Sequence, residues 1–167
     1  MTTVRRITAD EFPALRAVRI AALTDSPAAF GSTLDREVAF TDDMWRERAA
    51  SSAAGDERLT LLAWDGSEVV GVIGAFRTAA DDAVVELVSM WTRPAVRRSG
   101  VAVALVQGVV DWAGSLAGAT RVELWVVRGN APAQRLYERM GFAVTDRFQP
   151  HPNDPCAQEI RMVLPVA

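Results

Sequence analysis

The segment from Arg97 to Ala102 combines two arginines with small residues, at a point where a strand-like run gives way to a helical pattern. The first turn of a helix leaves backbone N–H groups unpaired and carries a partial positive charge, so phosphate oxygens can bind there. Gly100 and Ala102 permit close approach of a ligand, and the guanidinium groups of Arg97 and Arg98 supply charge and forked donors that suit phosphate. The segment therefore predicts a phosphate-binding turn.

A purely structural role for the same residues is the alternative, because Arg97 and Arg98 can solvate a helix start and Gly100 can serve close packing. The segment lacks the G-x-x-x-x-G-K-[ST] pattern of a P-loop, and the chain has no G-x-G-x-x-G followed by an acidic residue. Nucleotide hydrolysis and dinucleotide binding are therefore poorly supported.

A second motif lies further along the chain. The pattern N-x-x-A-x-x-L-Y-x-x-x-G-F is complete in Asn130, Ala133, Leu136, Tyr137, Gly141 and Phe142. Together with the pattern Q/R-x-x-G-x-G/A, which residues 97–102 match, it resembles the GNAT superfamily of acetyl-CoA-dependent N-acetyltransferases. Two motifs in the right order are specific, and the resemblance extends over residues 4–164.

The resemblance implies that acetyl-CoA binds in a gap between two strands. The pantetheine arm would pair like an extra strand with the backbone of Met90, Trp91 and Thr92, and an N–H of that strand would meet the developing oxyanion. Asn130 would bond the cofactor arm, although a plain helix N-cap is its alternative role. The pyrophosphate would contact Arg97, Arg98, Ser99, Gly100, Val101 and Ala102.

Two residues are candidates for proton transfer in the implied reaction. Tyr137 occupies the position at which the family often uses a phenol to protonate the departing thiolate; a core tyrosine is the alternative. An acceptor amine arrives as an ammonium and must lose a proton, so a base is needed. Glu86 falls where the histone-acetyltransferase branch carries its catalytic glutamate, and its apolar neighbours would raise its pKa. A solvated strand residue, with a water chain acting as the base, is the alternative.

The acceptor is expected across the thioester from the cofactor, walled by residues 27–33, the helix from Thr41 and the turn 150–155. Phe30, Gly31 and Trp45 are the predicted acceptor contacts, although Phe30 and Trp45 would equally suit a core. The other tryptophans of the elements, Trp64, Trp112 and Trp125, are expected in the core. A small amine or amino acid, an aminoglycoside-like antibiotic and a protein N-terminus or lysine all stay open as acceptors.

Length and composition indicate one globular domain over residues 1–167, since half the chain is hydrophobic and the net charge is only -3. The apolar runs are too short to cross a bilayer, and the N-terminal residues lack the apolar stretch of a signal peptide. We therefore expect a cytoplasmic protein without a membrane partner. All 18 basic residues are arginine, as codon bias in a GC-rich bacterial genome would produce.

The acidic balance, with a pI near 5.2, argues against nucleic acid as a partner. The chain has one cysteine, Cys156, and one histidine, His151, so a disulfide or zinc scaffold is excluded and no metal is implied. Both residues lack neighbours that would activate them, and we expect them to be exposed and inert.

The periodicity of apolar residues predicts the elements that must position these groups. It gives one mixed α/β unit of about seven strands and four helices. The resemblance to the GNAT superfamily implies that these form a GNAT-like fold, a mostly antiparallel twisted sheet flanked by the helices and splayed between the fourth and fifth strands. The expected helices cover residues 9–24, 41–52, 101–116 and 131–140. The expected strands cover residues 3–7, 59–64, 69–76, 84–91, 120–127, 142–148 and 157–164.

The function that follows is an N-acetyltransferase that moves acetyl from acetyl-CoA to a primary amine by direct attack. A non-catalytic module that binds and senses acyl-CoA is the alternative, since it would need the phosphate turn but neither Glu86 nor Tyr137. Members of the family are often dimers, which leaves a homodimer open.

Overall fold

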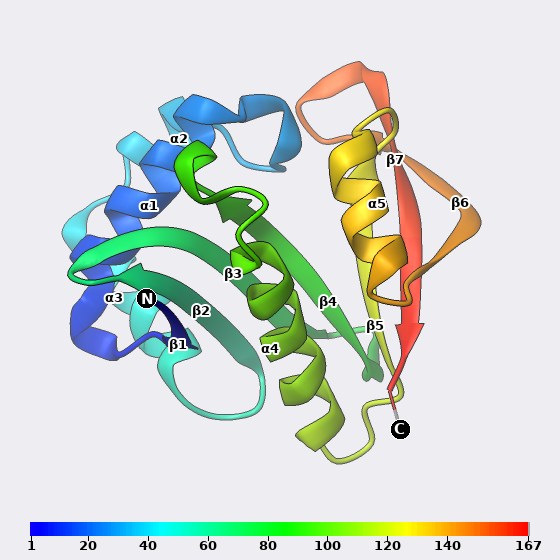
Figure 1. Cartoon of the computed structure of the whole chain (residues 1–167), viewed down its shortest axis with the longest axis horizontal. Helices are drawn as coiled ribbons and strands as arrows, with labels where there is room; N and C mark the ends of the chain where they lie inside the picture. The colour runs from blue at the N-terminus through cyan, green and yellow to red at the C-terminus, as the bar shows by residue number, and fades with distance from the viewer. Residues whose placement is uncertain (167) are drawn as a thin grey trace.

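A computed structural model describes residues 1–166 and contains one seven-stranded sheet (Figure 1). The strand order is β1-β2-β3-β4-β5-β7-β6, with every neighbouring pair antiparallel except β4 and β5, which are parallel. The strands are β1 (Thr2–Arg6), β2 (Arg58–Asp65), β3 (Glu68–Thr78), β4 (Asp81–Thr92), β5 (Arg121–Val127), β6 (Ala143–His151) and β7 (Asp154–Pro165). The mixed sheet of seven strands predicted from the sequence is confirmed.

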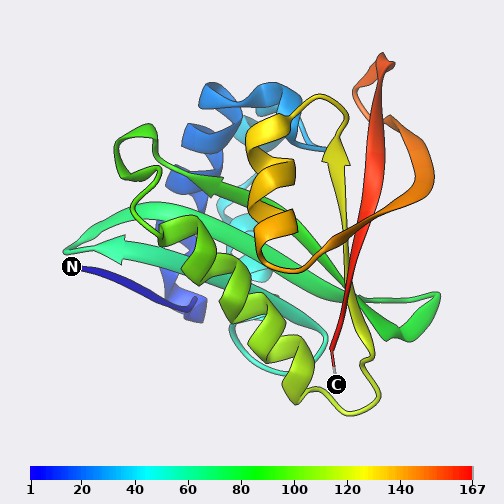
Figure 2. The ribbon, with the colours of Figure 1, turned by 45° about the vertical axis from the view of Figure 1, so that its right-hand side comes forward.

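Helices cover both faces of the sheet, as Figure 2 shows from a second direction. Helices α4 and α5 pack on one face and share one apolar core with the sheet, whereas α1 and α3 form a second core on the other face. The helices are α1 (Phe12–Asp25), α2 (Leu34–Val38), α3 (Asp42–Ala53), α4 (Val101–Ser115) and α5 (Ala131–Arg139). Short 3-10 turns cover Ala9–Glu11, Pro27–Ala29 and Pro94–Val96.

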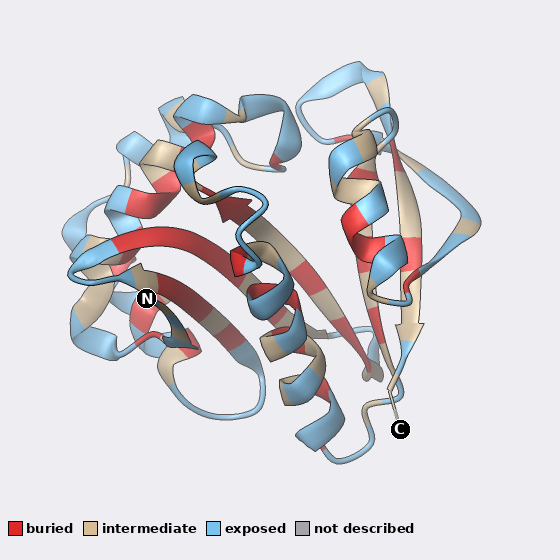
Figure 3. Ribbon diagram, viewed as in Figure 1, coloured by how far each residue is buried: buried red, intermediate tan, exposed pale blue. Residues whose placement is uncertain are grey.

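Helix α4 is the most apolar of these helices, and the predicted spacing places Val101, Leu105 and Val109 in the core. Its approach to the sheet depends on Gly108, because a Cβ there would come within 2.5 Å of Leu61 Cδ1 on β2. Burial concentrates where α4 crosses the central strands (Figure 3). The helix start, which carries the predicted phosphate turn, is thus fixed against the sheet.

Strand β4 changes direction near its carboxyl end. Ser89 has a positive φ of 59°, and the register to β3 shifts between the pairs Gly74–Val88 and Val72–Trp91. A β-bulge of this kind bends a strand and re-aims its backbone groups. In the described residues β4 pairs with β5 only over Val84–Leu87, so the two strands part beyond the bulge and the predicted splay is confirmed (Figure 1).

Two local features differ from the sequence prediction. The first helix begins with a 3-10 turn, in which Glu11 Oε2 accepts from the Thr8 backbone N–H at 2.9 Å, so the capping pattern lies one turn before α1. The short helix α2 was not predicted; Thr33 caps it by accepting from the Arg36 N–H at 3.2 Å. In residues 1–166 no helix combines the length and apolarity that crossing a membrane requires.

Candidate active site

A cleft of about 920 Å³ opens between the parted ends of β4 and β5. The phosphate turn and helix α5 close its other sides. Most of the predicted cofactor contacts line it, namely Met90, Trp91, Thr92, Arg97, Arg98, Gly100, Ala102, Asn130 and Tyr137. The sequence motifs, which lie far apart along the chain, therefore meet in one cleft.

The phosphate turn has backbone geometry that leaves donors open. Arg98 and Gly100 both have positive φ, 67° and 92°, and Gly100 is the N-cap of α4 without any side-chain cap hydrogen bond. The N–H groups of the first turn of α4 therefore have no capping acceptor among residues 1–166. Such a helix start can bind an anion.

Two predicted members of the turn do not line the cleft. Val101 is buried in the core beneath α4, because it occupies the helical face that packs on the sheet. The Ser99 hydroxyl turns back and donates to the Val96 carbonyl at 2.5 Å. Their side chains therefore have structural roles, and their predicted contact with the cofactor stays a prediction that concerns their backbone N–H groups.

Arg97 is held in place by Asp25, which sequence reasoning missed. Arg97 Nη2 lies 2.5 Å from Asp25 Oδ2, and Arg97 Nε donates to the Thr92 carbonyl at 3.2 Å. The Trp91 indole N–H donates to the same carboxylate oxygen at 2.9 Å. Hydrogen bonds from Trp91, Ser26 and Arg97 lower the pKa of Asp25 to about 2. The end of α1 thus fixes both the phosphate turn and the end of β4.

Helix α5 brings Asn130 and Tyr137 to the cleft. The Asn130 side chain accepts from the Ala133 N–H at 3.4 Å, so it caps the helix as well as lining the cleft. Tyr137 packs edge-on against Phe142 with ring centroids 5.6 Å apart. Burial raises the pKa of Tyr137, so its hydroxyl keeps its proton at neutral pH. A protonated phenol facing the cleft can act as a proton donor.

Glu86 lies on β4 and lines a second cavity, of about 530 Å³, next to the cleft. Burial, followed by the charges of Glu123 and Glu159, raises its pKa. Those two neighbours are held: Glu123 accepts from Arg121 at 2.8 Å, and Glu159 accepts from Gln149 at 2.7 Å. No hydrogen bond in the described residues contributes to the pKa of Glu86, so its carboxylate is available to accept a proton.

The two cavities share the β4 segment from Leu87 to Ser89, together with Phe30 and Trp125. Trp125 is half-buried and faces both cavities, so the expectation that it belongs to the core is wrong. It lies on the face of β5 that also carries Glu123, while the alternate residues are buried. The alternation of side chains along a strand places Trp125 on the same face as the charged Glu123, so the sequence could have indicated that Trp125 lies outside the core.

The predicted acceptor contacts separate into two groups. Phe30 and Gly31 line the second cavity, which residues from α3 and the turn after β6 also bound. Asn153 ties that turn to the 27–33 loop by donating to the carbonyls of Phe30 and Ser32, each at 3.3 Å. Trp45 is fully buried in the α1–α3 core and does not line the cavity, because it lies on the helical face that packs inward. Its prediction as an acceptor contact is corrected.

His151 is buried rather than exposed, which corrects another expectation. It ends β6, and its Nδ1 accepts from the Asn153 backbone N–H at 3.1 Å. The histidine therefore shapes the turn that borders the second cavity. Cys156 is exposed, as expected. Residues 1–166 contain no group of three His, Cys, Asp or Glu side chains arranged to hold a metal ion.

The family model described as the acetyltransferase (GNAT) family matches residues 19–142. No curated protein matches the chain in sequence.

Solved structures resemble the whole described chain. An acetyltransferase of the GNAT family from Streptococcus pneumoniae superposes with a TM-score of 0.84 at 18% identity, covering 100% of each chain. NAA60 from Arabidopsis thaliana, solved with a bisubstrate analogue, gives 0.73 at 19% identity, covering 99% of this chain and 98% of that one. A GCN5-related N-acetyltransferase from Kribbella flavida gives 0.77 at 22% identity, with coverage of 99% and 98%. Likeness at these identities shows a shared fold.

Proposed function

The chain belongs to the acetyltransferase (GNAT) family, and we propose that it transfers acetyl from acetyl-CoA to a primary amine by direct attack. The observation that carries the proposal is the pair of joined cavities, which present a proton acceptor and a proton donor from different elements. Glu86 lines the cavity on one side of the β4 bulge, and Tyr137 lines the cleft on the other. An acyl transfer to an amine needs both.

The cleft suits acetyl-CoA in three respects. Its volume of about 920 Å³ lies within the range of ligand sites. The edge of β4 beyond Leu87 is not paired with β5, so its backbone groups are free to bond an extended amide chain. The uncapped start of α4 and the side chains of Arg97 and Arg98 lie at one end, where a pyrophosphate would bind.

Acetyl-CoA would supply an acyl carbon activated as a thioester, and the residues of this chain handle the protons. Glu86 accepts a proton from the incoming ammonium, which leaves a lone pair on the amine nitrogen. The new N–C bond forms as the C–S bond breaks. The Tyr137 hydroxyl would donate its proton to the leaving sulfur, and the acylated nitrogen would lose its second proton, which returns through solvent to the Tyr137 oxygen, so that a neutral amide and a neutral thiol leave. Glu86 retains the ammonium proton until it too exchanges with solvent.

We also propose that residues 1–167 act as one catalytic unit in the cytoplasm. Both apolar cores pack on the same sheet, and the site takes residues from β4, β5, α5 and the turn before α4. The first half of the chain adds Ser26, Ala29 and Phe30 to the lining of the cleft.

The test is a screen for release of the CoA thiol from acetyl-CoA over a panel of primary amines, with the acetylated amine identified by mass spectrometry. The proposal predicts amine-dependent thiol release that Tyr137→Phe slows while acetyl-CoA affinity persists. Micromolar binding of acetyl-CoA without thiol release from any amine would instead support an acyl-CoA sensor.

A further inference from the structure

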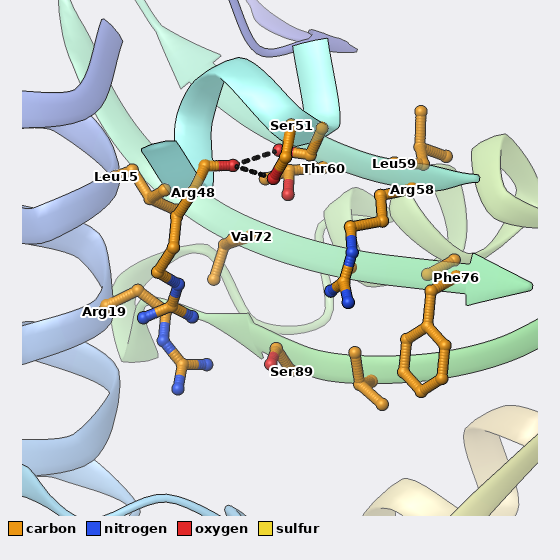
Figure 4. Close-up of a pocket in the computed structure, with 14 residues that line it drawn as sticks. Leu15, Arg19, Arg48, Ser51, Arg58, Leu59, Thr60, Val72, Phe76 and Ser89 are labelled. Atoms are coloured by element: carbon orange, nitrogen blue, oxygen red, sulfur yellow. Dashed lines mark hydrogen bonds between the residues drawn. The ribbon is translucent and has the colours of Figure 1, made fainter. Parts of the chain in front are cut away.

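A third, smaller cavity of about 110 Å³ continues from the second cavity and lies between helices α1 and α3 and strands β2 to β4. The second and third cavities share Arg19, Arg48, Val88 and Ser89 in their walls, so they adjoin each other at these residues. Figure 4 shows the guanidinium groups of Arg19, Arg48 and Arg58 projecting into this region from three different elements. No Asp or Glu side chain is among the residues that line the small cavity.

Arg19 contributes a buried donor that has no partner. Its side chain is only 4% exposed, and its Nε and Nη2 both donate to the Glu37 carboxylate. Its Nη1 is buried and has no hydrogen-bond partner within residues 1–166. A buried polar group without a partner is costly, and such atoms in a cavity wall point to a missing ligand group.

Arg48 adds a second guanidinium that is only partly compensated. Its Nη1 lies 3.5 Å from Glu37 Oε2, the same carboxylate that already binds Arg19. Burial lowers the pKa of Arg48, and the charges of Arg19 and Arg36 lower it further, although Glu37 opposes them. One carboxylate thus faces two buried or half-buried guanidiniums, which leaves one positive charge uncompensated.

Arg58 stands at the outer end of the small cavity, exposed and stacked over the Phe76 ring at 5.8 Å. Solvent screens its charge more than those of the inner pair. The uncompensated charge inside the cavity is therefore one positive charge, which a single monoanion would neutralise. A guanidinium pairs best with a planar carboxylate, and a space of this size holds a group of only a few atoms.

The opposite wall of the second cavity carries negative charge, from Glu86 and Glu159. Arg48 and Glu86 both line the second cavity, so this cavity has guanidinium groups where α1 and α3 bound it and carboxylates where the sheet bounds it. A ligand with an ammonium at one end and a carboxylate at the other would match both ends.

We propose that the acetyl acceptor is a small amine that also carries a carboxylate. The carboxylate binds Arg19 Nη1 and Arg48, with Arg58 at the entrance, and the ammonium lies toward Glu86. This inference rests on the proposed acetyltransferase function and specifies its substrate class. A free amino acid or a longer amino carboxylate meets the requirement, whereas a simple alkyl amine or a polycationic amine leaves the buried guanidiniums without a partner.

The test compares amino carboxylates of increasing length, from glycine to 6-aminohexanoate, with the corresponding amino amides. We expect kcat/KM for the best amino carboxylate to exceed that of its amide by about tenfold or more, since a charge-assisted hydrogen bond is lost in the amide. Arg48→Gln should remove this preference through KM while acetyl-CoA affinity stays unchanged. Arg58→Gln, at an exposed position that folding tolerates, should reduce the preference less.

The matched control is Arg46→Gln, because Arg46 lies on the same helix but pairs with Asp43 at the surface and lines none of the three cavities described here. It should retain the full preference. Equal use of carboxylates and amides by the unmodified protein, or a preference that survives Arg48→Gln, would overturn the subsite while leaving the acetyltransferase proposal intact.

A binding measurement separates the subsite from the reaction. Calorimetry should show that 6-aminohexanoate or a shorter amino carboxylate binds the unmodified protein more tightly than its amide, and that Arg48→Gln removes the difference. If no amine supports thiol release, the acetyltransferase proposal fails, and this titration still decides whether an anion binds at Arg19 and Arg48.

Discussion

Replacing Glu86 by glutamine should separate catalysis from stability. The side chain keeps its shape but can no longer accept a proton, and no hydrogen bond within residues 1–166 contributes to the pKa of Glu86, so few contacts are lost. General bases contribute about 10²–10⁴-fold to the rate. Because Glu86 is only half-buried, water can partly replace it. We therefore expect the low end, a fall in kcat/KM of about 100-fold, or about 2.7 kcal/mol in the barrier.

Glu86→Gln should lower activity but should leave the stability of the fold at pH 7 unchanged or higher. The pKa of Glu86 is raised in the folded protein above the ordinary value of 4.5, so folding favours its protonated form. This contribution is full below the unfolded pKa and is lost as pH rises through the folded pKa. At pH 7 the glutamine variant should therefore unfold at the same or a higher urea concentration than the unmodified protein, with no gain below pH 4.5.

The assay is thiol release from acetyl-CoA as a function of pH, with urea unfolding in parallel. The unmodified protein should lose activity as pH falls through the raised pKa of Glu86, and Glu123→Gln should move that limb to lower pH by removing a neighbouring negative charge. Full activity of Glu86→Gln with an unchanged pH profile would refute the assignment of the base.

Three further changes test other parts of the site. Tyr137→Phe should lower kcat by about 100-fold, because the hydroxyl is assigned to proton donation, and should leave the melting temperature unchanged. Thiol release and calorimetry measure these two quantities, and an unaltered kcat would remove Tyr137 from the reaction. Asp25→Asn should lower the melting temperature at pH 7, and the difference should shrink as pH falls from 3.8 through about 2, where the lowered pKa of Asp25 lies. A difference that is undiminished at pH 2 would contradict the role of the Asp25 ion pair. Gly71→Ala should cost about 1–3 kcal/mol in urea unfolding, since its Cβ would lie 3.0 Å from Leu105 Cδ1 and 3.2 Å from the Trp91 carbonyl; unchanged stability would mean that these neighbours yield freely.

The fold was predictable because its long elements carry strong periodic patterns. Helix α4 shows this best, since the positions of Val101, Leu105 and Val109 alone indicate its buried face. Helix α2 escaped prediction because it is a single capped turn without apolar periodicity. Strand pairs and the splay followed from the family resemblance rather than from the residues themselves.

That most of the motif residues line one cleft could also be expected, because they fall in two contiguous motifs and at the end of one strand. The remaining contacts depend on tertiary structure. Asp25 reaches Arg97 from the end of α1, and Arg19 meets Glu37 across a helix pair, so neither contact has a spacing that a sequence pattern could reveal. Trp45 takes the core position that was its alternative and Trp125 lines both cavities, and sequence could not separate these places because a tryptophan suits both a core and a cavity wall.

The central claim is that the cleft between β4 and β5 binds acetyl-CoA on the phosphate turn. Calorimetric titration of acetyl-CoA into the unmodified protein, beside the double variant Arg97→Ala and Arg98→Ala, tests this most directly. We expect micromolar binding that the double variant loses while its fold persists. Absence of binding or thermal stabilisation with any acyl-CoA would contradict it.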